Sequence, residues 1–279
     1  MGDLGVDTAV EEVGDGRYRA SVNKDWEIWG PMGGYAAAFA LRAVGACAGD
    51  VRPASFSCQY LGVASFDEID IEVVTLKAGR TVAFHRASVT QAGRPILEAM
   101  VCSIGESADG DHALEHVEID PPDVEGPDGL LSFDELRPDE APHFPFWDNL
   151  EGRPLQWIED WPPPEPLPAV WQQWLRFRPA ATFADPWVDA CRALVLVDIQ
   201  SWPSAHLPHA WREPAVYAPS LDLYVAFHEP NPWGEWLLAD GHSAVASGGL
   251  IGWTGRLWSP ERRLVASGGG QLLCRKLPG

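Results

Sequence analysis

The first 105 residues alternate between strand-like and helix-like patterns. Residues 16–22 alternate polar and apolar side chains, as in a half-buried strand. Residues 35–48 follow Gly33-Gly34 and are Ala-rich and apolar almost all round, which predicts a buried helix. Further strand-like segments, separated by glycine turns, follow at 54–61, 68–78, 81–91 and 95–104. The order is a strand, a long buried helix and an antiparallel meander.

The second half shows the same order. Residues 171–177 alternate as a strand, and Asp185-Pro186 has the residue types of a helix start, with a helix expected over 187–200. Strand-like segments follow at 221–228, 235–239, 244–258 and 263–273. Matching segments are offset by about 165 residues, and a repeat this long indicates a duplicated domain.

The periodicity fails between the halves, in a segment rich in Asp, Glu and Pro. We therefore predict an N-terminal domain at 1–106, an acidic Pro-rich connector at 107–168 and a C-terminal domain at 169–279. Aromatic residues in the connector indicate that part of it packs against the domains.

Composition narrows the class of partner. The formal charge of −20 disfavours nucleic acid and anionic membranes, so any anionic ligand must meet a local basic patch. The 5 cysteines are scattered and lack CxxC spacing, which favours reduced thiols in the cytoplasm. We expect no signal peptide, no membrane span and no metal or cofactor.

Asp222 stands out inside the strand at 221–228. A carboxylate is disfavoured in a half-buried strand, so it needs a partner or a function. The ordinary explanation is a strand-end aspartate bound to a neighbouring backbone N–H. The corresponding residue of the first repeat is Ser57, and this asymmetry favours a functional role for Asp222.

The duplicated helix and sheet predict an α+β double hotdog fold. Six stretches carry a resemblance to a known family: Gly30-Pro31-Met32-Gly33-Gly34-Tyr35, Ala78-Gly79-Arg80, Gln91-Ala92-Gly93-Arg94, Ser220-Leu221-Asp222, Glu235-Trp236-Leu237-Leu238 and Leu264-Val265-Ala266-Ser267. In their order and spacing they resemble the acyl-CoA thioesterase II (TesB-like) family. The resemblance covers both halves but not the acidic middle.

The resemblance implies hydrolysis of fatty acyl-CoA by a water molecule held between an aspartate, a hydroxyl residue and a glutamine. The aspartate corresponds to Asp222. When the family pattern is placed on this sequence without gaps, the hydroxyl position falls on Ala244 and the glutamine position on Gly270. Ser243 and Gln271, each one residue away, are therefore the candidates. A strand bulge is needed to bring them onto the correct face.

The substrate would lie at the start of the first helix. Backbone N–H groups at a helix N-terminus suit an oxyanion, and Gly33 and Gly34 allow close approach there. Tyr35 is near enough in sequence to line an acyl slot. Tight packing of the helix on the sheet would explain Gly33 and Gly34 equally well. Tyr35 could equally be an ordinary core residue. The fold also implies a possible homo-oligomer.

Two alternatives remain open. One is a non-catalytic acyl-thioester binding protein, which the residues at 244 and 270 favour. The other is a hotdog hydratase or dehydratase, which would need an Asp and a His five residues apart. Asp111 and His116 have that spacing but lack an adjoining Asn-Pro pair. Neither a GxSxG elbow nor a phosphate-binding glycine loop is present.

Overall fold

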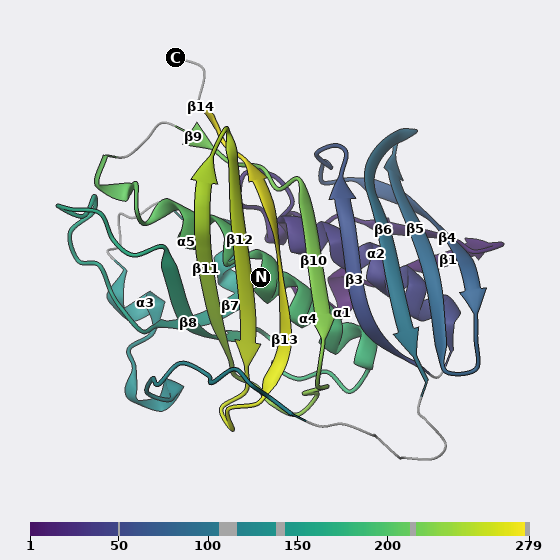
Figure 1. Ribbon diagram of the computed structural model, residues 1–279. Helices are drawn as coiled ribbons and strands as arrows, with labels where there is room; N and C mark the ends of the chain where they lie inside the picture. The colour runs from purple at the N-terminus through teal and green to yellow at the C-terminus, as the bar shows by residue number, and fades with distance from the viewer. Residues whose placement is uncertain (50, 106–115, 138–142, 213–215, 277–279) are drawn as a thin grey trace.

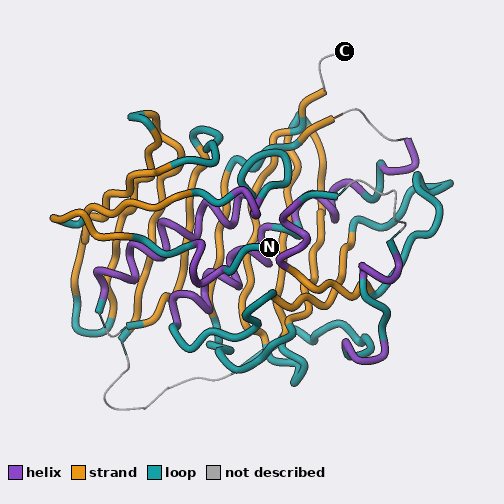
Figure 2. Tube along the Cα trace, turned by 180° about the vertical axis from the view of Figure 1, so that it is seen from behind, coloured by secondary structure: helices purple, strands orange, loops and turns teal. Residues whose placement is uncertain are grey.

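The computed structural model describes residues 1–49, 51–105, 116–137, 143–212 and 216–276. A 12-stranded antiparallel sheet dominates it, with strand order β1-β2-β4-β5-β6-β3-β10-β13-β12-β11-β8-β7. The sheet curves around the two long helices, which lie together on its inner face (Figures 1 and 2). This arrangement confirms the predicted α+β double hotdog.

The elements fall into two similar series. The first contains α1 (Leu4–Asp7), β1 (Glu11–Gly14), β2 (Arg17–Ser21), η1 (Lys24–Trp26), α2 (Gly33–Ala48), β3 (Arg52–Tyr60), β4 (Glu68–Ala78), β5 (Val82–Gln91) and β6 (Arg94–Ile104). Between the series lie η2 (Pro127–Gly129), α3 (Phe133–Leu136), η3 (Pro145–Asn149) and β7 (Leu150–Pro154). The second contains β8 (Val170–Phe177), α4 (Pro186–Asp198), α5 (Ser201–His206), η4 (Ala210–Arg212), β9 (Val216–Tyr217), β10 (Asp222–Phe227), β11 (Leu237–Ser247), β12 (Leu250–Trp258), β13 (Leu264–Leu273) and β14 (Arg275–Lys276).

The two long helices form the centre of the molecule. α2 and α4 pack against each other and against the inner face of the sheet. A Cβ at Gly34 would lie 2.9 Å from Cα of Val195, so the glycine permits close approach of the two backbones. α4 begins as predicted, with Asp185 Oδ1 accepting a hydrogen bond from Trp187 N at 2.8 Å.

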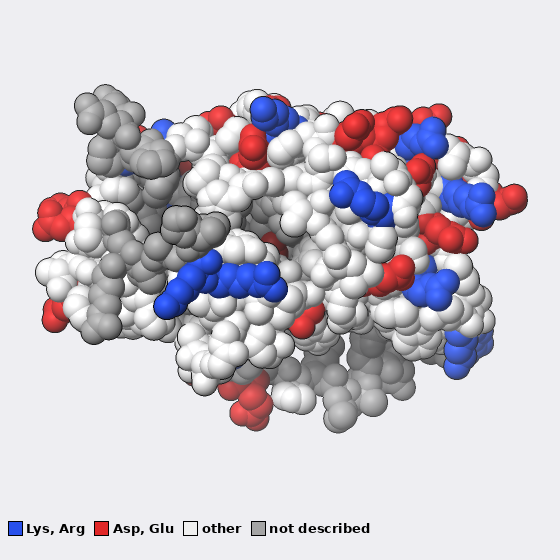
Figure 3. Space-filling view, turned by 90° about the horizontal axis from the view of Figure 1, so that it is seen from above, with Lys and Arg blue, Asp and Glu red and all other residues white. Residues whose placement is uncertain are grey.

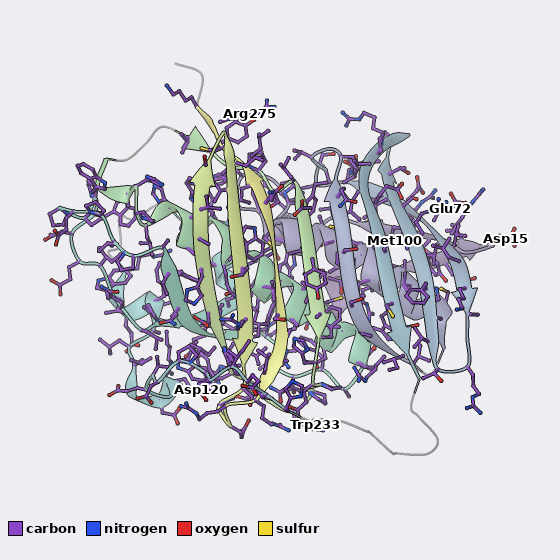
Figure 4. The ribbon with its side chains drawn as sticks, viewed as in Figure 1. Asp15, Glu72, Met100, Asp120, Trp233 and Arg275 are labelled. Carbon is purple, nitrogen blue, oxygen red and sulfur yellow. The ribbon has the colours of Figure 1, made fainter. Side chains whose placement is uncertain are left out.

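The two repeats meet where β3 pairs with β10. Phe56 lies opposite Val225, and both side chains are buried. One cluster of buried apolar side chains runs through both repeats, so the duplicated domains share a continuous core. The outer face carries more exposed residues, such as Met100 on β6, whose side chain is 42% exposed (Figure 4).

The predicted connector is not wholly a connector. Its residues 150–154 form β7, which pairs with β8 at the edge of the sheet. The buried Glu151 links β7 to β8 by accepting a hydrogen bond from Arg176, and it also accepts one from Arg153 of its own strand. Five residues among prolines are too few to show strand periodicity in the sequence, and the pairing partner supplies the missing stabilisation.

Across the described ranges, none of the helices has the length and apolar character needed to span a membrane.

Candidate active site

Asp222 lies at a bulge between β10 and β13. Ser220 pairs with Leu272 and Tyr224 pairs with Gly269, so three residues of one chain segment face two of the other. Such a bulge bends the strand and redirects a side chain. Asp222 is only partly buried, at the end of β10 that adjoins β3 and β13.

The Asp222 carboxylate is held by the backbone of β13. Its Oδ1 accepts a hydrogen bond from Gln271 N at 2.9 Å, the strand-end contact that we gave as the ordinary explanation. No donor to its Oδ2 is found among the described residues. One carboxylate oxygen is therefore fixed, and the other keeps its capacity to accept a proton.

Gly270 provides the space for this carboxylate. A Cβ at Gly270 would lie 2.4 Å from the Asp222 carbonyl oxygen and 2.9 Å from its Oδ1. The neighbouring Gln271 is exposed, whereas Leu272 beyond it is buried. Gln271 thus reaches Asp222 through its backbone N–H, and its side chain is on the solvent side of the strand.

Ser243 also lies at a bulge, in β11. The pairing of β11 with β12 shifts between His242 and Val245, which leaves Ser243 and Ala244 opposite one residue. The Ser243 hydroxyl donates to the Gly252 carbonyl at 3.1 Å. β12 and β13 separate β11 from β10, a span of about 14 Å at ordinary strand spacing. The structure therefore does not place Ser243 beside Asp222.

The N-terminus of α2 holds Gly33 and Gly34 as predicted. The Gly34 N–H, however, donates to Oδ2 of Asp198 at 2.8 Å. No acceptor for the Gly33 N–H is found within the described part of the chain. Of the two amides proposed for an oxyanion, one is occupied by a carboxylate and one is free to bind a ligand.

Tyr35 belongs to the core. Its ring stacks on Trp26 with centroids 4.8 Å apart, and its side chain is fully buried. Its hydroxyl accepts from Asn23 N and donates to the Asp7 carbonyl, both at 3.0 Å. These contacts attach the first turn of α2 to the segments that contain Asp7, Asn23 and Trp26.

Asp198, at the end of α4, is a buried carboxylate that the sequence reading did not select. Burial raises its pKa to about 6, although the hydrogen bond from Gly34 opposes this shift. Its Oδ1 has no hydrogen-bond partner. A carboxylate directly after the apolar run at 193–197 was the available signal, since such a group needs a buried partner.

Tyr60 and Cys58 on β3 complete the buried polar group around the α2 N-terminus. The Tyr60 hydroxyl oxygen is buried and interacts with the Cys58 side chain. Burial raises the pKa of Tyr60 well above its usual value, and the nearby Cys58, Asp198 and Asp222 add to this effect. The Tyr60 backbone N–H donates to the Leu221 carbonyl at 2.9 Å, which ties β3 to the residue before Asp222.

Figure 3 views the end of the molecule at which β10 begins and β13 ends, and this face is hollowed near its middle. A cavity of about 1050 Å³ lies at the opposite end of α2, between Arg42, Arg52, Arg80 and the first turn of α4. We place the candidate site at the first of these ends because Asp222, Tyr60 and Asp198 are grouped there.

The hydratase alternative depends on the pair Asp111 and His116. Asp111 lies outside the described residues, so the Asp111–His116 pair has no described geometry. In the ranges that the structure describes, no group of three or more His, Cys, Asp or Glu side chains is arranged to hold a metal ion.

Each of the two repeats matches a domain of one known protein family. Residues 22–104 match the sequence model of the acyl-CoA thioesterase N-terminal domain, and residues 123–271 match that of the acyl-CoA thioesterase C-terminal domain. The second match begins inside the predicted connector. A comparison with curated proteins found no match.

Solved structures share the fold over nearly the whole chain. An acyl-CoA thioesterase II, TesB2, from Mycobacterium marinum is 20% identical with a TM-score of 0.79, covering 99% of this chain and 100% of its own. A tesB protein from Mycobacterium avium subs paratuberculosis is 21% identical with a TM-score of 0.76, covering 98% of both chains. A hot dog fold protein of unknown function from Alicyclobacillus acidocaldarius is 20% identical with a TM-score of 0.81, covering 99% of this chain and 98% of its own.

Proposed function

This chain belongs to the acyl-CoA thioesterase family, and from that premise we propose that it hydrolyses acyl-CoA thioesters to a free acid and CoA. The observation that carries the proposal is the placement of Asp222. Its carboxylate is fixed through one oxygen by the Gln271 N–H. It interacts with Tyr60, whose hydroxyl lies near Gly33 at the N-terminus of α2.

In the proposed reaction, Asp222 acts as a general base. Its free oxygen accepts a proton from a water molecule while the water oxygen attacks the thioester carbon. The negative charge that develops on the carbonyl oxygen is stabilised by the Gly33 N–H and by the dipole of α2. The tetrahedral intermediate then expels the CoA thiolate, which takes the proton from Asp222, and the free acid leaves.

The other predicted site residues have supporting roles in this proposal. Gln271 orients Asp222 through its backbone N–H. Gly34 and Tyr35 fix the first turn of α2 through their bonds to Asp198, Asn23 and Asp7. Ser243 is the exception: it lies on β11, three strands away from Asp222 on β10, so Ser243→Ala should leave turnover unchanged.

The CoA portion of the substrate is anionic, whereas the chain is acidic overall. The ribbon formed by β9 and β14 continues from the Asp222 end and carries Arg275 opposite Tyr217, with Lys276 beside it (Figure 4). We assign these two cations to attraction of the CoA phosphates.

We further propose a cytoplasmic location, a role in fatty acid metabolism and a homo-oligomeric state, the last to be tested by light scattering.

A non-catalytic acyl-thioester binding protein is the second candidate. It is favoured by the small residues Ala244 and Gly270, which carry no hydroxyl or amide side chain to hold a water.

The test is release of free thiol from a panel of acetyl-, butyryl-, octanoyl-, palmitoyl- and benzoyl-CoA, measured with a thiol-reactive dye. Hydrolysis predicts turnover of at least one substrate. Binding of an acyl-CoA by calorimetry without thiol release from any member of the panel would reject hydrolysis and favour the binding protein.

A further inference from the structure

The cavity of about 1050 Å³ at the end of α2 opposite the candidate site has a basic lining. Arg42, Arg52 and Arg80 line it, and among its described lining residues Asp185 has the only acidic side chain. The chain as a whole has 40 Asp and Glu against 20 Lys and Arg. The cavity therefore reverses the charge balance of the protein, and such a local reversal attracts anions.

Three separate elements of the first repeat bring these arginines together. Arg42 lies on α2, Arg52 is the first residue of β3, and Arg80 is in the turn between β4 and β5. This turn lies close to the start of β3, because a Cβ at Gly105 would be 3.7 Å from both the Arg80 carbonyl oxygen and Cγ1 of Val51. The positive charges therefore converge through tertiary structure, and no run of basic residues in the sequence marks the site.

Two of the three guanidinium groups have no carboxylate partner within the described part of the chain. Arg42 Nη1 forms an ion pair with Asp185 Oδ2 at 2.9 Å, and the same carboxylate caps α4. The Arg52 guanidinium makes only a long hydrogen bond of 3.5 Å, to the Pro53 carbonyl, and Arg80 is exposed. Three positive charges and one negative charge leave the lining with a net charge of +2.

The cavity also has an apolar wall, formed by Val10, Val51, Ile104 and Trp187. The indole of Trp187 is fixed, because its Nε1 donates to the Val51 carbonyl at 2.9 Å. A Cβ at Gly45 would lie 2.6 Å from this ring, so the glycine leaves the space that the ring occupies. A wall that is already in place suits a ligand with an organic group beside its charge, since little ordering is needed on binding.

We propose that this cavity binds an organic phosphomonoester, with the phosphate at Arg52 and Arg80 and the organic group along the apolar wall. A phosphomonoester carries about −1.5 to −2 charges at neutral pH, which matches the net charge of the lining, whereas a carboxylate leaves one positive charge unpaired. Guanidinium groups bind phosphate through pairs of parallel N–H donors. The cavity is about 20 Å along α2 from Gly33, so this inference does not depend on the proposed hydrolysis.

The first test compares phenyl phosphate with phenyl sulfate, which has the same aromatic group but only one negative charge. Binding is measured by calorimetry at neutral pH in a buffer without phosphate. We expect phenyl phosphate to bind with a Kd below about 1 mM, and phenyl sulfate to bind about fivefold more weakly. Phenyl phosphate should also raise the melting temperature, because it binds the folded state across both repeats.

Variants then locate the binding. Arg52→Gln combined with Arg80→Gln should raise the Kd of phenyl phosphate at least about tenfold and remove the rise in melting temperature. Arg80→Gln alone, in an exposed turn, should raise the Kd by about threefold or more and serves if the double variant is unstable. Arg86→Gln is the matched control, because Arg86 is exposed on β5 and lies outside the cavity lining. Its Kd should equal that of the wild type.

Three results would overturn the proposal: no binding of phenyl phosphate by the wild type up to about 10 mM, equal binding of phenyl sulfate, or an unchanged Kd in Arg80→Gln and in the double variant.

Displacement of phenyl phosphate separates two sources of the ligand. Displacement by CoA would assign the cavity to the phosphomonoester that CoA itself carries. Displacement by adenosine 5′-phosphate but not by CoA would assign it to an independent phosphomonoester. Both results support the proposal, and neither depends on whether the wild type releases thiol from an acyl-CoA.

Discussion

The backbone N–H of Gly34 in the first repeat donates to the carboxylate of Asp198 in the second, at 2.8 Å. This bond joins the N-terminus of one central helix to the C-terminus of the other. It satisfies a helix donor that would otherwise be unpaired, and it places a buried negative charge at the positive end of a helix dipole. The two repeats are thus linked at the point where the candidate site is built.

Asp198 should make stability depend on pH. Its pKa is raised by burial from 3.8 to about 6, so the folded state favours the protonated acid. The associated stability is present below about pH 4 and is lost as pH rises through about 6, a change of about 3 kcal/mol. The difference in unfolding free energy between wild type and Asp198→Asn, from urea titrations at pH 4 to 7.5, should shift by that amount in favour of the variant. A difference that is constant with pH would contradict the assigned burial.

Gly34→Ala should destabilise the packing of the two central helices. The added Cβ would meet Cα of Val195 at 2.9 Å and the Leu194 carbonyl at 3.0 Å, both backbone atoms that cannot move alone. We expect a loss of about 1–3 kcal/mol in unfolding free energy. Gly126→Ala is the control, because nothing lies within 4 Å of a Cβ there. Equal stability of the two variants would argue against close helix contact.

Gly270→Ala should impair the site and also lower stability, because the new Cβ would lie 2.4 Å from the Asp222 carbonyl oxygen. The new Cβ would come within 2.9 Å of Asp222 Oδ1, so the carboxylate must shift from its place opposite the Gln271 N–H. A displacement of this kind should lower kcat at least tenfold. The control is Gly252→Ala on β12, where the nearest atom is an ordinary 3.4 Å away. Full activity of Gly270→Ala would show that Asp222 does not need this position.

Glu151→Gln should weaken the attachment of β7. Burial alone would raise the pKa of Glu151, but hydrogen bonds from Arg176 and Arg153 outweigh it and hold the pKa below its usual range. Because both arginines are partly exposed, we expect a loss of about 1–2 kcal/mol at neutral pH. That loss should shrink as pH falls below about 4, where the wild-type carboxylate also becomes protonated.

Glu235→Gln is the control for that change, because Glu235 is exposed and contacts only one of these arginines. Its effect should stay within about 0.5 kcal/mol. The result to look for in urea titration is a clear gap between the two variants at pH 7 that narrows as pH falls below about 4.

Local patterns were sufficient to predict much of the fold. The apolar run after Gly33-Gly34 forms α2, and Asp185-Pro186 begins α4, as predicted. The repeat offset predicted two similar domains, and these domains pair through β3 and β10. Each of these depends on neighbours along the chain. β7 was missed because its stabilisation comes from β8 and from Arg176 rather than from its own short sequence.

The site was harder to predict because it is assembled from distant segments. Asp222 could be selected from its strand, but Tyr60 and Asp198 acquire their positions only when β3, α2 and α4 converge. The positions of Ser243 and Gln271 depend on bulges of one residue, and a shift of one residue reverses the face of a strand. The sequence alone does not specify which side of the bulge each side chain takes.

The central claim is that Asp222 activates the hydrolytic water, and thiol release by Asp222→Asn tests it most directly. The variant should retain acyl-CoA binding and thermal stability within a few degrees of wild type, while kcat falls at least 10²-fold. Asp70→Asn, an exposed aspartate on β4 paired with Arg19, should behave as wild type. Wild-type turnover by Asp222→Asn would contradict the claim.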